Sequence, residues 1–169
     1  GLVGSEMCIR DRPSGTPAYK DNSPIVSATD RCNMVKLAIK PFDYMSLSTI
    51  ETDRPGNTYT ADTLAQIYDS YKKIYFIIGA DSLLYIQDWY HPEYICSHCH
   101  LLCANRDNNS ASVLIDQKHF LADKYGAVID FIDVPELPYS STDIRKKVAM
   151  GLSVKEDVGE EVEEYIKSR

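Results

Sequence analysis

The sequence predicts an α/β fold with a mainly parallel sheet, and three observations lead to this prediction. Apolar runs of strand length alternate along the chain with amphipathic stretches of about 10–15 residues, which is the pattern of βαβ units. The run IYFII at 74–78 is apolar throughout, as expected for a strand buried on both faces of a parallel sheet. The composition, with 44% hydrophobic and 25% charged residues, is that of a single globular domain.

The elements of the first half each have a local reason. Residues 27–40 are expected to form a helix capped by Ser27. Apolar and polar residues alternate in YMSLSTIE at 44–51, which predicts a half-buried strand. Thr60 is expected to cap a second helix.

The second half continues the alternation of strands and helices. Gly126 is expected to close the longest helix, because glycine readily adopts the left-handed conformation found after helix ends. The predicted elements are a helix at 92–99, a strand at 101–104, a helix at 112–125, a strand at 127–134, and helices at 141–150 and 160–168.

Charge and hydrophobicity exclude several classes of protein. A formal net charge of −7 argues against a general nucleic-acid binder, which needs a basic face. The longest apolar stretch is interrupted by Asp81 and is too short for a membrane span. No segment has the pattern of an export signal. Five cysteines, an odd number, are therefore expected to be reduced thiols in the cytoplasm.

Ligands of open parallel sheets bind at the carboxyl ends of strands, and GADS at 79–82 follows such a strand. Gly79 would let a ligand approach the backbone, and Asp81 could accept hydrogen bonds from a ribose diol. The alternative is purely structural, with Gly79 turning the chain and Asp81 capping the next helix.

The segment PYSSTDIRKKV at 138–148 has two interpretations. In the first it is a helix start, with Ser141 or Thr142 as the cap and Asp143 at the positive end of the helix dipole. In the second it is an anion site, where helix N–H groups, spare hydroxyls and the Arg145 guanidinium hold a phosphate.

Two further features have open interpretations. Trp89, the only tryptophan, either packs in the core or stacks on a heteroaromatic ligand. The segment CSHCHLLC at 96–103 offers cysteines and histidines for zinc, but a second ligand pair is lacking. Cys103 lies in an apolar strand, where a free cysteine behaves as a small hydrophobe, so no metal is predicted.

Several segments in one order resemble the nicotinate-nucleotide adenylyltransferase family. They are FIIGADSLLYIQDWYHPEYI, a strand ending in Arg106, and PYSSTDIRKKVAMGLSVKEDVGEEVEEYI, with DRCNMVKLAIK and RPGNTYTADTL upstream. The likeness begins near Pro13 and implies a Rossmann-like nucleotidyltransferase fold. It also implies transfer of the adenylyl group of ATP to nicotinate mononucleotide, with release of pyrophosphate.

The resemblance implies a role for each matching residue. Small-molecule nucleotides are the implied partners, and Mg²⁺ is the implied cofactor, held mainly by ATP. Arg145 and Thr142 are expected to be catalytic. The expected ATP-binding residues are Gly79, Asp81, Ser140, Ser141, Thr142 and Arg145, and the expected pyridine nucleotide-binding residues are Trp89, Tyr59, Thr60 and Arg106.

The beginning of the sequence departs from this family. Its G-G-T-F-D-P-x-H-x-G-H motif, first strand and first helix have no counterpart here, and residues 1–12, GLVGSEMCIRDR, look foreign. We therefore expect one incomplete domain at 13–169, without measurable turnover. Gly159 is a smaller departure, because the family often has proline there.

Two other functions remain open at this stage. One is the activity of a related pantetheine-phosphate or cytidylyl transferase, and the other is a non-catalytic nucleotide-binding module. The spacing of Trp89 and the T-Y-T-x-D-T match argue against the first. The sequence leaves open the oligomeric state and the preference for the acid or the amide of the pyridine.

Overall fold

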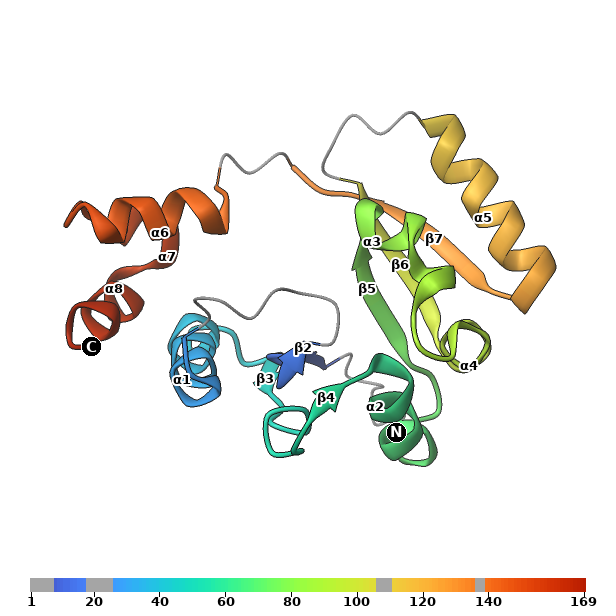
Figure 1. Ribbon diagram of the computed structural model, residues 1–169, viewed down its shortest axis with the longest axis horizontal. Coiled ribbons are helices and arrows are strands. Elements are labelled where there is room, and N and C mark those ends of the chain that lie inside the picture. Colours follow the sequence, from blue (N-terminus) through green and yellow to red (C-terminus); the bar gives the residue numbers. More distant parts are fainter. Residues whose placement is uncertain (1–7, 18–25, 106–110, 136–138) are drawn as a thin grey trace, which may run out of the picture. The chain divides into compact units, whose positions relative to one another are not determined.

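The computed structural model describes residues 8–17, 26–105, 111–135 and 139–169 (Figure 1). The chain divides into two compact units. Unit 1 comprises Gly1–Thr58 together with Tyr139–Arg169, and unit 2 comprises Tyr59–Pro138. This division does not test the predicted boundary between residues 1–12 and the domain at 13–169, which stays a prediction.

Unit 2 is built on a three-stranded parallel sheet in the order β5-β6-β7 (Figure 1). Its strands are β5 (Tyr75–Gly79), β6 (His100–Asn105) and β7 (Val128–Asp133). Gly79 pairs with Ala104, and Asn105 with Asp133, so the three strands end at one edge. The predicted parallel strands are confirmed.

Helices of unit 2 pack on this sheet. Contacts join α3 to β5 and β6, α4 to β6, and α5 to β7. The helices are α2 (Thr60–Ile67), α3 (Ala80–Leu84), α4 (Pro92–His98) and α5 (Ala111–Tyr125), with the 3₁₀ turns η1 (Tyr68–Ser70) and η2 (Ile86–Asp88). Gly126 follows α5 with φ +68°, as the prediction of a glycine stop requires.

The core of unit 2 lies between the sheet and these helices. Each fully buried aliphatic side chain contributes about 1.5–3 kcal/mol relative to an exposed one. Those with no exposed surface or almost none are Leu83, Ile86, Ile95, Leu101, Leu121 and Ile129.

The prediction that strand 74–78 is buried on both faces is wrong for the described structure. Ile78 is 4% exposed, whereas Tyr75 and Ile77 on the opposite face are 42% and 53% exposed. Side chains of a strand alternate between faces, and the core described above receives only the face of Ile78. An uninterrupted apolar run therefore does not identify which face receives the helices.

Unit 1 contains two short pairs of parallel strands. They are β1 (Ile9–Asp11) with β3 (Met45–Leu47), and β2 (Thr16–Pro17) with β4 (Asn57–Thr58). The predicted strand at 44–51 is confirmed in its first half. β1 falls within residues 1–12, so part of the segment that looks foreign is paired with the rest of unit 1.

The first helix of unit 1 is α1 (Ala28–Ile39), and its predicted cap is confirmed. The Ser27 hydroxyl accepts a hydrogen bond from the Asp30 N–H at 3.0 Å and donates to the Asp30 carboxylate at 2.6 Å. This reciprocal arrangement satisfies a backbone donor that the helix leaves without a partner.

Helices after residue 140 complete unit 1. The predicted helices 141–150 and 160–168 are confirmed as α6 (Ser141–Ala149) and α8 (Glu160–Lys167), and a short α7 (Lys155–Val158) lies between them. Gly159 precedes α8 with φ +86°. A proline ring fixes φ near −65°, so the proline that is frequent in the family does not fit this conformation.

Tyr165 joins α8 to α1. Its hydroxyl donates to the Asp30 carboxylate at 2.8 Å and accepts from the Asn33 amide at 2.9 Å. Because both partners lie on α1, one side chain aligns two helices that are far apart in the sequence.

Glu163 of α8 holds the α6–α7 connection. Its carboxylate accepts hydrogen bonds from the Ser153 hydroxyl at 2.7 Å and the Val154 N–H at 2.8 Å, and it pairs with Lys167 at 3.0 Å. The side chain is almost fully buried. These donors, Ser153 first, lower the pKa of Glu163 to about 2, because they stabilise the ionised form.

This network predicts that acid destabilises the protein through Glu163. An ordinary glutamate has a pKa of 4.5, above the folded value, so the stabilisation is present above that pH and is lost as the pH falls towards 2. Measured by urea unfolding, the free energy of unfolding should fall over this range more steeply for the wild type than for Glu163→Gln. The variant should be the less stable of the two at neutral pH. Exposed Glu164 provides the control, because Glu164→Gln should keep the wild-type profile, and identical profiles for all three proteins would contradict the assignment.

Candidate nucleotide-binding site

Gly79 and Asp81 lie at the carboxyl edge of the sheet in unit 2. Gly79 is the last residue of β5 and the N-cap of α3, and Asp81 is an exposed acidic residue in the first turn of that helix. Of the structural alternative, one part holds: Gly79 lies where the chain turns from β5 into α3, although its φ of −76° is one that any residue adopts. The other part is wrong, because Asp81 lies inside the helix rather than at its N-cap.

The residues predicted to bind the pyridine are also in unit 2. Tyr59 is the N-cap of α2, and its carbonyl accepts hydrogen bonds from both the N–H and the hydroxyl of Thr63 at 3.2 Å. The prediction that Thr60 caps α2 is therefore wrong, because Thr60 is already the first helical residue.

Tyr90 brings the start of α2 and the Trp89 segment together. Its ring lies 4.5 Å from that of Tyr59, centroid to centroid, at an interplanar angle of 37°. Tyr90 follows Trp89 directly, so Tyr59, Thr60 and Trp89 come from one region of unit 2. Tyr90 was not among the predicted site residues. The signal that could have identified it is its position between Trp89 and the helix that begins at Pro92.

The core-packing interpretation of Trp89 is confirmed in part, and stacking on a ligand stays a prediction. Its indole is partly buried against the core, with the Phe76 ring 6.4 Å away in an edge-on arrangement. It follows η2 in an extended conformation and keeps part of its surface accessible. Arg106, the fourth residue predicted to bind the pyridine nucleotide, lies outside the described residues.

In unit 1 the cap of α6 is Ser140, not Ser141 or Thr142 as predicted. The Ser140 hydroxyl accepts from the Asp143 N–H at 3.0 Å and donates to the Asp143 carboxylate at 2.7 Å. Ser140 is the N-cap because its backbone has the extended conformation that a cap requires, at φ −116° and ψ 145°. The next two hydroxyls are consequently not needed for capping.

These two hydroxyls and Arg145 lie on one side of the helix start. Residues three and four apart are neighbours on a helix surface, so Arg145 lies over both Ser141 and Thr142. All three side chains are exposed and make no hydrogen bond or ion pair with other residues that the structure describes.

The three cations of α6 differ in their partners. Lys147 pairs with the buried carboxylate of Asp157 at 2.6 Å, and Lys146 lies 3.8 Å from Asp143. Arg145 alone has no acidic partner within the described ranges. A guanidinium beside two hydroxyls is suited to a phosphate, because it offers several donors in a planar fork.

The reciprocal cap predicts a cost for removing the Ser140 hydroxyl. Ser140→Ala should lower the free energy of unfolding by about 0.5–2 kcal/mol, because an α6 N–H loses its acceptor. Ser141→Ala is the matched control and should change stability little, since Ser141 is exposed in the first turn. Equal losses in the two variants, measured by urea unfolding, would show that Ser140 is not the cap.

The cysteine–histidine segment belongs to the core. Cys96, Cys99 and Cys103 are buried, and none of the five cysteines, all of which lie in the described ranges, forms a disulfide. Burial, reinforced by the Glu93 charge, raises the pKa of Cys96 to about 11. Burial also raises the pKa of Cys103. These thiols are therefore protonated, and the prediction that Cys103 acts as a small hydrophobe is confirmed.

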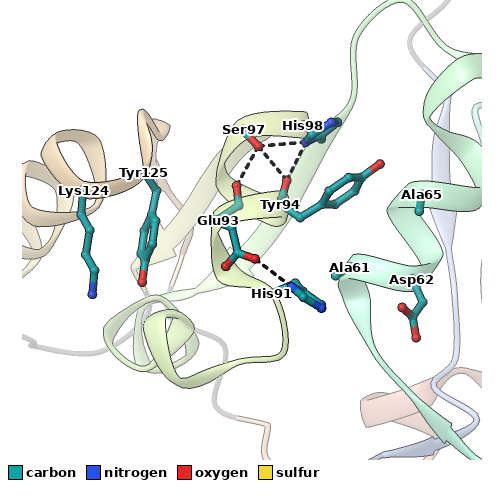
Figure 2. Close-up of a pocket in the computed structure, with 10 residues that line it drawn as sticks. All are labelled: Ala61, Asp62, Ala65, His91, Glu93, Tyr94, Ser97, His98, Lys124 and Tyr125. Carbon is teal, nitrogen blue, oxygen red and sulfur yellow. Dashed lines mark hydrogen bonds and ion pairs between the residues drawn. The ribbon is translucent and has the colours of Figure 1, made fainter.

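A pocket of about 610 Å³ lies elsewhere in unit 2 (Figure 2). The last turns of α4 and α5 contribute to it and precede β6 and β7, so it lies towards the amino ends of these strands. None of the predicted site residues lines it. Its lining residues are Ala61, Asp62, Ala65, His91, Glu93, Tyr94, Ser97, His98, Lys124 and Tyr125.

The polar groups of this pocket largely engage one another. His91 Nδ1 lies 2.7 Å from a Glu93 carboxylate oxygen, which lowers the pKa of Glu93. His98 stacks on the Tyr94 ring at 3.8 Å and hydrogen-bonds the Ser97 hydroxyl at 2.9 Å, as Figure 2 shows.

Comparison with known proteins defines the class. The sequence matches the Cytidylyltransferase-like family over residues 9–147. The structure is similar to Plasmodium falciparum nicotinic acid mononucleotide adenylyltransferase complexed with NaAD, with a TM-score of 0.74 at 16% identity over 96% of this chain and 80% of that one. The same enzyme complexed with APC gives a TM-score of 0.71. The protein is thus a nucleotidyltransferase with the predicted Rossmann-like fold.

Sequence relatives narrow this class. A probable nicotinate-nucleotide adenylyltransferase of Lachnoclostridium phytofermentans is 36% identical over 156 residues, which cover 91% of this chain and 78% of the relative. One from Moorella thermoacetica is 37% identical over 160 residues, covering 93% and 74%. The chain belongs to the nicotinate-nucleotide adenylyltransferase family. Among the described residues, no helix is long and apolar enough to cross a membrane.

Proposed function

We propose that the protein takes part in NAD biosynthesis by transferring the adenylyl group of ATP to nicotinate mononucleotide. The observation that carries this proposal is the start of α6, where Arg145 has two neighbouring hydroxyls and no acidic partner among the described residues. The names of the relatives, nicotinate-nucleotide adenylyltransferases over most of the chain, support it.

In the proposed reaction a phosphate oxygen of nicotinate mononucleotide attacks the α-phosphorus of ATP. The new P–O bond gives nicotinate adenine dinucleotide, and the bond to the β-phosphate breaks to release pyrophosphate. No protein nucleophile is required, because such transfers depend on positioning and charge neutralisation.

The roles of the residues follow from their chemistry. Ser140, Ser141, Thr142 and Arg145 bind the phosphates of ATP, with Thr142 and Arg145 stabilising the charge that develops during transfer. In unit 2, Gly79 and Asp81 bind the ribose of the adenosine. The Tyr59–Thr60 backbone and the Trp89 ring receive the pyridine, and Arg106 contacts the pyridine nucleotide.

Mg²⁺ accompanies ATP in this proposal and is held mainly by the phosphates. In the described part of the chain no three His, Cys, Asp or Glu side chains form a group that could hold an ion. Among the described residues at the start of α6 the oxygen ligands are hydroxyls and the carboxylate of Asp143, which is engaged by Ser140. We therefore assign no step to a protein-held metal.

Ligand selectivity and turnover test the proposal together. Calorimetry should detect binding of ATP and nicotinate mononucleotide, but not of CTP or pantetheine phosphate. Pyrophosphate release should require ATP and nicotinate mononucleotide in a version whose residues 1–12 are replaced by the family's G-G-T-F-D-P-x-H-x-G-H segment. Binding of CTP or pantetheine phosphate would favour a related transferase, and binding without release would favour a non-catalytic module. The expectation that the unmodified chain gives no turnover stays a prediction, which the same assay tests.

The phosphate role of Arg145 predicts a loss of ATP affinity without a loss of folding. Arg145→Ala should weaken ATP binding by about 10–150-fold, since a hydrogen bond to a charged group contributes about 1.5–3 kcal/mol. The melting temperature should change little, as is usual when an exposed residue is substituted. Lys146→Ala is the matched control and should weaken binding less. Unchanged ATP affinity with a lowered melting temperature would make Arg145 structural.

The pyridine role of Trp89 predicts a fluorescence change. Because Trp89 is the only tryptophan, quenching by nicotinate mononucleotide reports stacking on this ring, and ATP alone should change the emission little. Emission that is insensitive to both ligands would leave Trp89 with core packing only.

A further inference from the structure

Asn105 carries a buried polar atom that has no partner among the residues that the structure describes. Its side-chain oxygen is inaccessible to solvent and makes no hydrogen bond within the described part of the chain. Most buried polar atoms in folded proteins are hydrogen-bonded, since an unmade bond in the interior costs free energy. Such an atom calls for an explanation, and one explanation is a role in binding.

The position of Asn105 indicates that purpose. It is the last residue of β6, one residue beyond the Ala104 that pairs with Gly79, so it lies at the carboxyl edge of the sheet. Strand alternation places its side chain on the same face as Leu101 and Cys103, which are buried beneath the helices. Contacts between α3 and β6 show that α3, the helix that carries Asp81, packs against this strand.

We propose that Asn105 is a nucleoside-binding residue, whose amide hydrogen-bonds the adenosine part of ATP at this edge. This inference rests on the proposed function and adds a residue to which the family resemblance assigns no role. An amide suits the task because it both donates and accepts. Asn105 as a whole is only half-buried, so a turn of the side chain can bring the amide to a hydroxyl or amino group of the nucleoside.

A satisfied asparagine in the same chain offers a matched control. The Asn33 amide donates to the Tyr165 hydroxyl at 2.9 Å and helps to join α1 to α8. Removing this amide should lower stability, because it breaks a made hydrogen bond, and should leave ATP affinity unchanged. Removing the Asn105 amide should lower ATP affinity and should not lower stability.

The test compares Asn105→Leu, Asn105→Ala and Asn33→Leu by calorimetry with ATP and by melting without ligand. Both Asn105 variants should weaken ATP binding by about 3–10-fold, the range of one neutral hydrogen bond. Their melting temperature should be unchanged or raised, most clearly for the leucine variant, which has a similar branched outline and only apolar atoms. Affinity for inorganic tripolyphosphate should not change, because this probe has no nucleoside.

The other outcomes overturn the inference in distinguishable ways. Wild-type ATP affinity in Asn105→Ala and Asn105→Leu would show that the amide does not touch the nucleoside, while the proposed function would stand. A lowered melting temperature with unchanged affinity would assign Asn105 a structural role, for example through a buried water. A wild-type protein that binds no ATP would overturn both this inference and the proposed function.

Discussion

The parallel pairing of β5, β6 and β7 is the constraint on which the chemistry of unit 2 depends. Parallel strands that start together also end together, and the register from Gly79 through Ala104 brings their last residues to one edge. Helices on a single face hold this register through the core around Leu101. The glycine, carboxylate and amide offered to a nucleoside are therefore a consequence of strand pairing.

In unit 1 the candidate phosphate-binding residues are exposed by side-chain contacts around α6 rather than by strand pairing. Lys147 is engaged by a buried aspartate, Ser140 is used as the cap of α6, and Glu163 fixes the connection that follows this helix. These local interactions leave Arg145 and two hydroxyls exposed at the helix start. Of the four residues proposed to bind phosphate, only Ser140 also stabilises the helix, as its cap.

The sequence predicted what depends on local pattern and missed what depends on packing. Ser27 and its Asp30 partner identified α1, and the apolar runs identified β5, β6 and β7, because caps and hydrophobic periodicity are local. Which of three consecutive hydroxyls caps α6 depends on backbone angles, so Ser140 was missed. The open face of β5, the Tyr59–Tyr90 contact and the buried oxygen of Asn105 arise from tertiary packing, which residue spacing does not encode.

In the proposed function the carboxyl edge of the sheet, and not the pocket of Figure 2, binds the adenosine of ATP. Amide chemical-shift mapping of the assigned protein during an ATP titration distinguishes the two places. We expect the resonances of Gly79, Asp81 and Asn105 to shift with one common affinity, while those of Ala65 and Ser97 in the pocket stay in place. Shifts confined to the pocket residues would contradict it.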